Sequence, residues 1–108
     1  MFTVATDPQF THTVTVLVPV DGGHDAQTMQ VTYRVQPADK EGPDTSTAEG
    51  STEFLRAAVV TIGHLVDDAK QPVPWNDALR DRLFAVPYVR AALAKGYYAA
   101  INKGVLGN

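Results

Sequence analysis

The residues with the most versatile chemistry in this chain are three histidines, His12, His24 and His64. Histidine is the side chain that most often serves as a general base or a metal ligand near neutral pH. No two of them have the spacing that would place them together on one helix face or one strand face, so there is no local pair of metal ligands. We expect structural roles for them. A small metal-binding or enzymatic domain that assembles its site from separate segments is the less favoured alternative.

The acidic residues offer two close pairs, Asp67 with Asp68 and Asp21 with Asp25. Paired carboxylates become catalytic when burial separates their pKa values, whereas adjacent acids in a turn face water. The segment from Asp21 to Asp25 has two glycines but lacks the Gly-Lys-Ser/Thr ending and the following helix of a phosphate-binding loop. The chain contains 0 cysteines, which excludes disulfides and thiolate chemistry. We therefore predict no catalytic residue, no metal and no cofactor.

Length and charge restrict the remaining functions. A chain of 108 residues predicts one domain, residues 1–108. The net charge is −3 and the basic residues are scattered, so we expect no nucleic-acid partner. The beginning of the sequence lacks the basic and apolar regions of a signal peptide, and no apolar run is long enough to span a bilayer. We expect a cytoplasmic protein without membrane contact.

The first third of the chain alternates between two kinds of side chain. Valines at 14, 16 and 18 point one way and threonines at 11, 13 and 15 the other, and the alternation returns from Thr28 to Val35. A period of two rich in β-branched residues predicts half-buried strands, here at about 10–18 and 28–36. The intervening Asp-Gly and Gly-Gly pairs allow a positive φ and hence a tight turn. We therefore predict that these two strands form an antiparallel β-hairpin.

Residues 37–50 are rich in Pro, Gly, Ser, Thr and acids, with little to bury, and predict a mobile loop. Ser51 or Thr52 offers a helix N-cap, and apolar residues follow at helical spacing up to Gly63, so we predict a helix over about 52–62. Between 64 and 74, two short apolar pairs flank an acidic turn, which favours a second short β-ribbon.

The last third predicts two consecutive helices, at about 76–86 and 87–102. Asn76 is the N-cap of the first, and Pro87 ends it while suiting the first position of the second. We expect Trp75 and Tyr97 in the core. The predicted fold class is α+β, with an N-terminal antiparallel β-hairpin, a second short β-ribbon and three α-helices.

The final helix is apolar nearly all round. Val89 and Leu93 form one stripe, Tyr98 lies opposite with two alanines, and between Tyr88 and Ile101 only Arg90 and Lys95 are charged. A helix of this kind must be covered on both sides, and in a short chain the second cover is another subunit or a partner protein. We predict an interface with a charged rim, made by Tyr88, Arg90, Ala91, Ala94, Lys95 and Tyr98.

Several segments together resemble the tail assembly chaperones of long-tailed bacteriophages and prophages. The segments are Phe54-Leu-Arg56, the acidic turn before Pro72-Val-Pro-Trp75, the Leu79/Leu83 helix, Val86-Pro-Tyr-Val-Arg-Ala-Ala-Leu93 with the following Tyr97, and the strand ending Val18-Pro-Val-Asp-Gly-Gly-His24. They cover nearly the whole chain. Two features depart from the family pattern: Gly96 stands where a helix former is expected, and the turn at 67–71 has no glycine.

The resemblance implies a non-enzymatic, oligomeric chaperone in the cytoplasm of the bacterial host. Such a protein guards the tape measure protein, helps to recruit tail-tube protein, and is absent from the mature virion. Members often also exist as a longer product of a programmed frameshift. The alternative within the same class is a tube or terminator subunit that stays in the virion.

Overall fold

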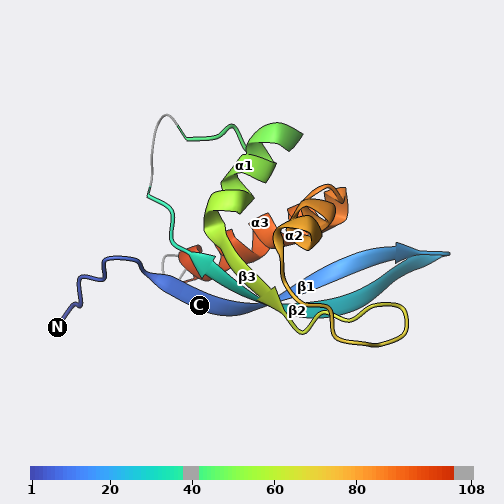
Figure 1. Ribbon diagram of the computed structural model, residues 1–108. Helices are drawn as coiled ribbons and strands as arrows, with labels where there is room; N and C mark the ends of the chain where they lie inside the picture. Colours follow the sequence, from blue (N-terminus) through green and yellow to red (C-terminus); the bar gives the residue numbers. More distant parts are fainter. Residues whose placement is uncertain (38–41, 104–108) are drawn as a thin grey trace.

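The computed structural model describes residues 1–37 and 42–103 and has the predicted α+β fold (Figure 1). A three-stranded antiparallel sheet in the order β1-β2-β3 forms one layer, and the helices of the described chain lie on one face of it (Figure 1). The elements are β1 (Gln9–Val20), β2 (Gly23–Arg34), α1 (Ala48–Ala58), β3 (Val59–Gly63), α2 (Asp77–Phe84) and α3 (Pro87–Asn102).

The hairpin is longer than the predicted strands at 10–18 and 28–36. Val20 pairs with Gly23, so only Asp21 and Gly22 form the turn. Gly22 has φ of 78°, the left-handed conformation that glycine adopts without a steric penalty. We expected the glycines to make a longer connection. Because the turn has only two residues, the residues on either side of it belong to the strands.

The two faces of the hairpin differ sharply. Val14 is paired with Met29, and both side chains are buried beneath the helices. On the other face, Thr11 and Thr32 are joined by a side-chain hydrogen bond of 3.0 Å, and Gln30 donates to Thr13 at 2.8 Å. The alternation in the sequence therefore separates a core face from a polar face that the described chain leaves open.

The prediction of a helix over 52–62 was wrong at both ends. Helix α1 begins earlier, because the Thr47 side chain caps it by accepting a hydrogen bond of 2.9 Å from the Gly50 N–H. It ends at Ala58, and Val59–Gly63 forms the edge strand β3, which pairs with β2. The four β-branched residues Val59-Val-Thr-Ile62 fit a pleated strand better than a helix.

The predicted loop 37–50 is therefore shorter than expected, because 48–50 belong to α1; residues 38–41 of that prediction lie outside the described residues. Gly50 is buried against the main chain of Asp44, and a Cβ at this position would collide with the Asp44 carbonyl. In the sequence, a glycine at this position favoured a loop. In the structure, the absence of a side chain at Gly50 allows the main chain of Asp44 to pack against the first turn of α1.

The segment between β3 and α2 contains the predicted β-ribbon only as an isolated β-bridge. Val66 and Pro72 make an antiparallel bridge, and Val73 donates its N–H to Leu65. Asn76 then caps α2 through a hydrogen bond of 2.8 Å from Leu79 N–H. The predicted helices at 76–86 and 87–102 correspond to α2 and α3, with Pro87 at the start of α3.

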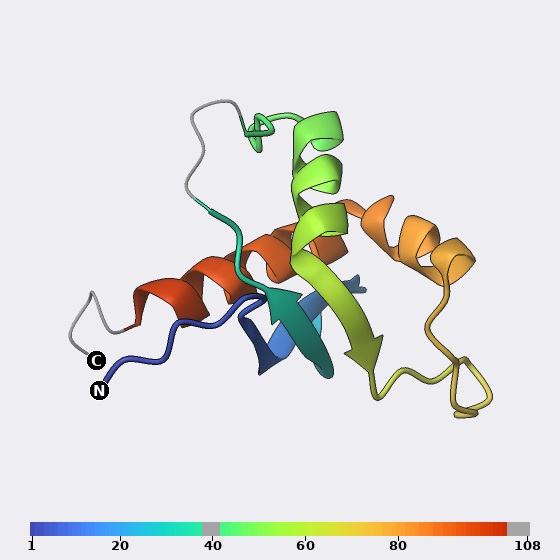
Figure 2. The ribbon, with the colours of Figure 1, turned by 60° about the vertical axis from the view of Figure 1, so that its left-hand side comes forward.

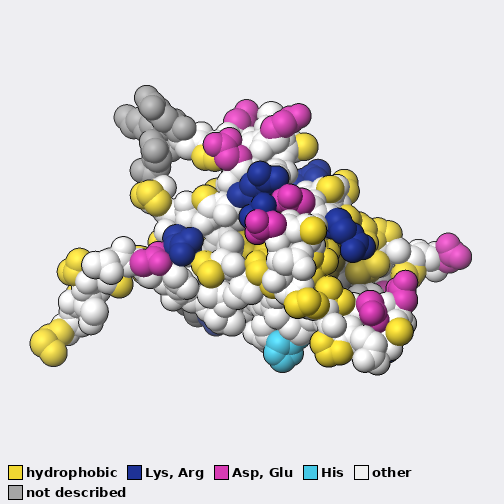
Figure 3. All heavy atoms as spheres, viewed as in Figure 1, with side chains coloured by type: hydrophobic (Ala, Val, Ile, Leu, Met, Phe, Trp, Pro, Cys, Tyr) yellow, Lys and Arg dark blue, Asp and Glu magenta, His cyan; other side chains and the backbone are white. Residues whose placement is uncertain are grey.

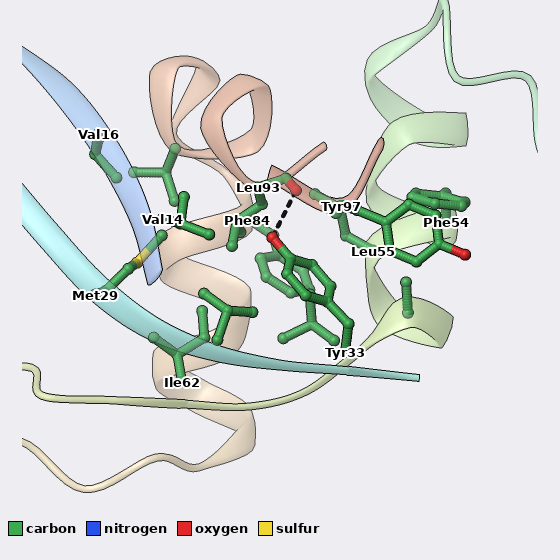
Figure 4. Close-up of a cluster of buried hydrophobic side chains, with 14 residues drawn as sticks. Val14, Val16, Met29, Tyr33, Phe54, Leu55, Ile62, Phe84, Leu93 and Tyr97 are labelled. Atoms are coloured by element: carbon green, nitrogen blue, oxygen red, sulfur yellow. Dashed lines mark hydrogen bonds between the residues drawn. The ribbon is translucent and has the colours of Figure 1, made fainter. Parts of the chain in front are cut away.

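The core lies between the sheet and the helices and is centred on Tyr33 of β2 (Figure 4). Its ring is fully buried, and its hydroxyl donates to the Leu93 carbonyl of α3 at 2.7 Å. Tyr97 is buried as predicted, and its hydroxyl accepts a hydrogen bond of 2.9 Å from Gln36 N–H. Trp75 is only half-buried, at the edge of the core beside Phe84.

Gly96 explains how α3 lies so close to the sheet. A Cβ at Gly96 would stand 2.8 Å from a methyl group of Val14 and 3.1 Å from the Tyr33 hydroxyl. Alanine would favour the helix but would push it off β1. A glycine at this position of α3 thus has a packing reason.

Candidate protein-binding surface on the last helix

The outer face of α3 is open to solvent in the described structure. Tyr88, Ala91, Lys95 and Tyr98 are all exposed, at spacings of three and four residues that place them on one face of a helix. The opposite face carries Val89, Leu93 and Tyr97, which are buried against the sheet and α1. We call the four exposed residues the outer stripe. Figure 2 shows α3 lying across the sheet with α1 and α2 beside it.

One end of the outer stripe is organised by aromatic stacking. Tyr98 is 43 % exposed, and its ring stacks on Phe54 of α1 with the centroids 5.6 Å apart and the planes 10° from parallel. Ile101, one turn further along α3, is also exposed. Phe54, Ala57, Tyr98 and Ile101 line part of a cleft of about 500 Å³. The stacking restricts the Tyr98 side chain.

The other end of the stripe borders a second hollow. Tyr88 lines a groove of about 280 Å³ together with residues of the hairpin, the segment after β3, and α2; these include Val18, Met29, Val66 and Leu83. Val66 is 55 % exposed. Figure 3 shows hydrophobic side chains gathered on the segment that follows β3. The outer stripe therefore joins two apolar hollows, neither of which was predicted from the sequence.

Two of the predicted interface residues are less available than the other four. Ala94 and Arg90 are both half-buried. The Arg90 guanidinium donates to the Phe84 carbonyl at 2.8 Å, at the C-terminal end of α2, where a cation is favourable. Arg90 thus holds the corner between α2 and α3, whereas Lys95 stands exposed in the middle of the stripe. Nothing in the sequence signalled this corner contact.

Four charged side chains of α1 and α2 form ion pairs with one another. Arg56 of α1 contacts Asp81 of α2 at 3.1 Å, and Arg80 contacts Asp81 at 3.1 Å and Asp77 at 3.4 Å. Figure 3 shows these charges together where α1 meets α2. The ion pairs are exposed and contribute little to stability. They leave the surface between the two helices close to neutral.

The three histidines lie on three different segments of the fold. His12 is half-buried on β1, His24 is exposed near the tip of the hairpin, and His64 is exposed after β3, with φ of 62°. Within residues 1–37 and 42–103, no group of three His, Asp or Glu side chains is placed to hold a metal ion.

Of the predicted carboxylate pairs, Asp67 and Asp68 lie in the turn between Val66 and Pro72, whereas Asp21 is in the hairpin turn and Asp25 belongs to β2. Asp67 accepts hydrogen bonds from Ala69 N–H at 2.8 Å and Gln71 N–H at 3.0 Å, and Asp25 accepts one from Gln27 at 3.0 Å. Both are exposed. A carboxylate that closes a turn has a structural role.

The groups whose pKa values are shifted also lie away from the outer stripe. Burial raises the pKa of the Tyr33 phenol well above its ordinary value, because the charged form would lose its hydration. The hydrogen bond from Arg34 lowers the pKa of Asp7, and the hydrogen bonds from Ser46 lower that of Asp44. These shifts belong to the core, to an exposed ion pair and to the turn before α1.

Comparisons with protein-family models, with curated proteins and with solved structures give no match. None of the helices in the described residues has the length and apolar character that crossing a bilayer would require. Function must therefore be inferred from the surface itself.

Proposed function

We propose that this chain is a phage tail assembly chaperone. In this proposal it is a non-enzymatic, self-associating protein that binds the tape measure protein in the cytoplasm of the bacterial host, assists assembly of the tail-tube protein, and is absent from the mature virion. The sequence resemblance supports the family. The placement of the histidines on three different segments and the turn-closing role of Asp67 favour a role without catalysis.

The observation that carries the proposal is the outer stripe on α3. Tyr88 and Tyr98 stand exposed at its two ends, with Ala91 and Lys95 between them. A long helical tape measure protein has apolar stripes that would aggregate before assembly. An amphipathic helix can lay its apolar face along such a surface, with aromatic rings at the ends and small residues between.

The proposal is tested by co-expressing this chain with the tape measure protein of the same phage genome. We expect the tape measure protein to become soluble and to elute with this chain as one complex. Unchanged solubility without a complex would overturn the proposal. Finding this chain in purified virions would instead favour the tube or terminator alternative.

A matched pair of substitutions locates the contact. Ala91→Glu puts a charge in the middle of the outer stripe, whereas Ala78→Glu puts the same charge on an exposed position in the first turn of α2. We expect the Ala91 variant to lose the complex and the Ala78 variant to keep it, because a carboxylate in the middle of an apolar contact must be desolvated, which is costly even beside Lys95. Equal binding by both variants would place the contact elsewhere.

A further inference from the structure

Helix α3 carries positive charge although the chain as a whole is acidic. The net charge of the chain is −3, yet α3 contains Arg90 and Lys95 and neither Asp nor Glu. Lys103 follows directly after the helix. A partner that lies along the outer stripe therefore meets cations, and complementary charge favours a partner with acidic side chains.

The two cations of α3 differ in their surroundings. The Arg90 guanidinium is half-buried and donates to the Phe84 carbonyl at 2.8 Å, so the fold itself already binds it. Lys95 is exposed, and within residues 1–37 and 42–103 it forms no ion pair with a carboxylate. Lys95 is thus the cation that the outer stripe offers to a partner.

The side chains next to Lys95 on α3 are mostly small. Ala91, Ala92 and Ala99 stand three or four residues away from it, and Tyr98 is the large neighbour. Small side chains let two helices approach to the lower end of the usual range of about 8–10 Å between their axes. At that separation the partner covers the stem of Lys95, and the ammonium group lies within or beside an apolar contact.

A partner that covers Lys95 must replace the hydration of its ammonium group. Desolvating a charged group is costly unless an opposite charge or hydrogen-bond acceptors compensate for the lost water. The described chain brings no carboxylate to Lys95, and the α2 carboxylates Asp77 and Asp81 already contact Arg80 and Arg56. The compensating carboxylate must therefore come from the partner.

We propose that the outer stripe selects a helical segment that carries an Asp or Glu opposite Lys95. The apolar face of this segment lies between Tyr88 and Tyr98, and its carboxylate accepts a hydrogen bond from the Lys95 ammonium. This inference rests on the proposed function, in which the segment belongs to the tape measure protein, and it adds the chemistry by which the segment is recognised. An apolar segment without the acid binds less well, because it leaves the ammonium dehydrated and unpaired.

Replacing the charge while keeping a long side chain tests the ion pair. Lys95→Met alters an exposed position, so the fold should be retained. The partner carboxylate then lacks its counter-charge, and after co-expression we expect a tagged tape measure protein to retain about tenfold less of this variant than of the parent chain. Lys95→Arg keeps the charge and should lose much less.

Recovery of Lys95→Met equal to or above that of the parent chain would overturn the proposal. That result would mean that the lysine extends past the contact into water, where it has no ion pair to lose.

Arg82→Met is the matched control for the loss of one positive charge. Arg82 is an exposed cation of α2, outside the outer stripe, and it too forms no ion pair in the part of the chain that the structure describes. We expect its recovery with the tape measure protein to equal that of the parent chain. An equal loss in both variants would show that only the total charge matters, and it would overturn a specific contact at Lys95.

A carbodiimide cross-linker identifies the carboxylate directly. The reagent takes up the elements of water as an amine and a carboxylate in contact form an amide bond, and it adds no spacer between them. In the parent complex we expect mass spectrometry to find Lys95 joined to an Asp or Glu of the tape measure protein. A link from Lys95 to a carboxylate of a second copy of this chain would assign the lysine to self-association and overturn the proposal.

The same experiments separate this inference from the proposed function. If the parent chain forms no complex with the tape measure protein, the proposed function fails and the inference fails with it. If the parent chain and Lys95→Met form the complex equally well, the proposed function stands and the inference alone is overturned.

Discussion

The two long faces of α3 differ little in apolar content but greatly in what covers them. The inner face places Leu93 and Tyr97 against the sheet and α1, with Gly96 allowing close approach to β1. The outer stripe carries two tyrosines, yet the described chain leaves it in water. Composition alone therefore does not separate the buried residues of α3 from the exposed ones, and contact with the sheet does. Substitutions on the inner face should lower the free energy of unfolding, whereas substitutions on the outer stripe should leave it nearly unchanged.

The largest effect is expected at the centre of the inner face. Leu93 is 0 % exposed, and Leu93→Ala leaves a cavity beneath Tyr33 and β1. We expect the free energy of unfolding to fall by about 3 kcal/mol, measured by urea denaturation. A loss under about 1 kcal/mol would show that this face is not packed as described.

Gly96 provides a sharper test of the close approach to β1. Gly96→Ala should destabilise by about 1 kcal/mol, because the overpacking cost exceeds the gain in helix propensity. The same change in a Val14→Ala background removes the clashing methyl groups. There the loss should be smaller, because only the Tyr33 hydroxyl, 3.1 Å away, still crowds the new methyl group. An equal loss in both backgrounds would contradict the contact.

The hydrogen bond from Tyr33 to Leu93 has a moderate expected effect. Tyr33→Phe keeps the ring and removes the hydroxyl that donates at 2.7 Å. We expect a loss of about 1 kcal/mol in the free energy of unfolding near neutral pH. The variant should retain the circular dichroism spectrum of the parent chain.

The same phenol predicts a dependence of stability on pH. Its pKa is raised by burial in the folded chain, while the unfolded chain ionises near the ordinary value of 10.0. Above that pH the unfolded state binds fewer protons, so stability present at lower pH is lost as pH rises. Unfolding measured between about pH 9 and about pH 11 should show a smaller loss in Tyr33→Phe than in the parent chain. Equal slopes would contradict a buried phenol.

The smallest effect on folding is expected on the outer stripe. Ala91→Glu and Lys95→Glu alter exposed positions and should change the free energy of unfolding by less than about 0.5 kcal/mol. Their effect should appear in binding to the tape measure protein. A loss of stability comparable to that of Leu93→Ala would mean that the outer stripe is covered by the chain itself.

Much of the fold follows from periodicity in the sequence. The alternation from Phe10 to Val18 predicts the hairpin, and Asn76 and Pro87 mark where α2 and α3 begin. Strand β3 was missed because Phe54, Leu55, Ala58, Val59 and Ile62 also have helical spacing. The open side of β2 decides between helix and strand for Val59–Gly63, and single-sequence spacing does not include that tertiary pairing.

The candidate surface could be predicted only in part. Helical spacing places Tyr88, Ala91 and Tyr98 on one face, and all three are exposed. The contact from Arg90 to Phe84 depends on the angle between α2 and α3, and the groove beside Tyr88 depends on where the segment after β3 lies. Neither follows from local pattern. Membership of the tail assembly chaperone family, for which the sequence resemblance is the support, remains a proposal.

Helix α1 runs into β3 without a connecting residue: Ala58 ends the helix and Val59 begins the strand. A joint of this kind cannot absorb a change in length. One inserted residue would move the Ile62 side chain from the core face of the sheet to its solvent-exposed face, because strand side chains alternate between the two faces. Homologous chains that differ in length should therefore carry their insertions elsewhere, and this junction should be the position least tolerant of added residues.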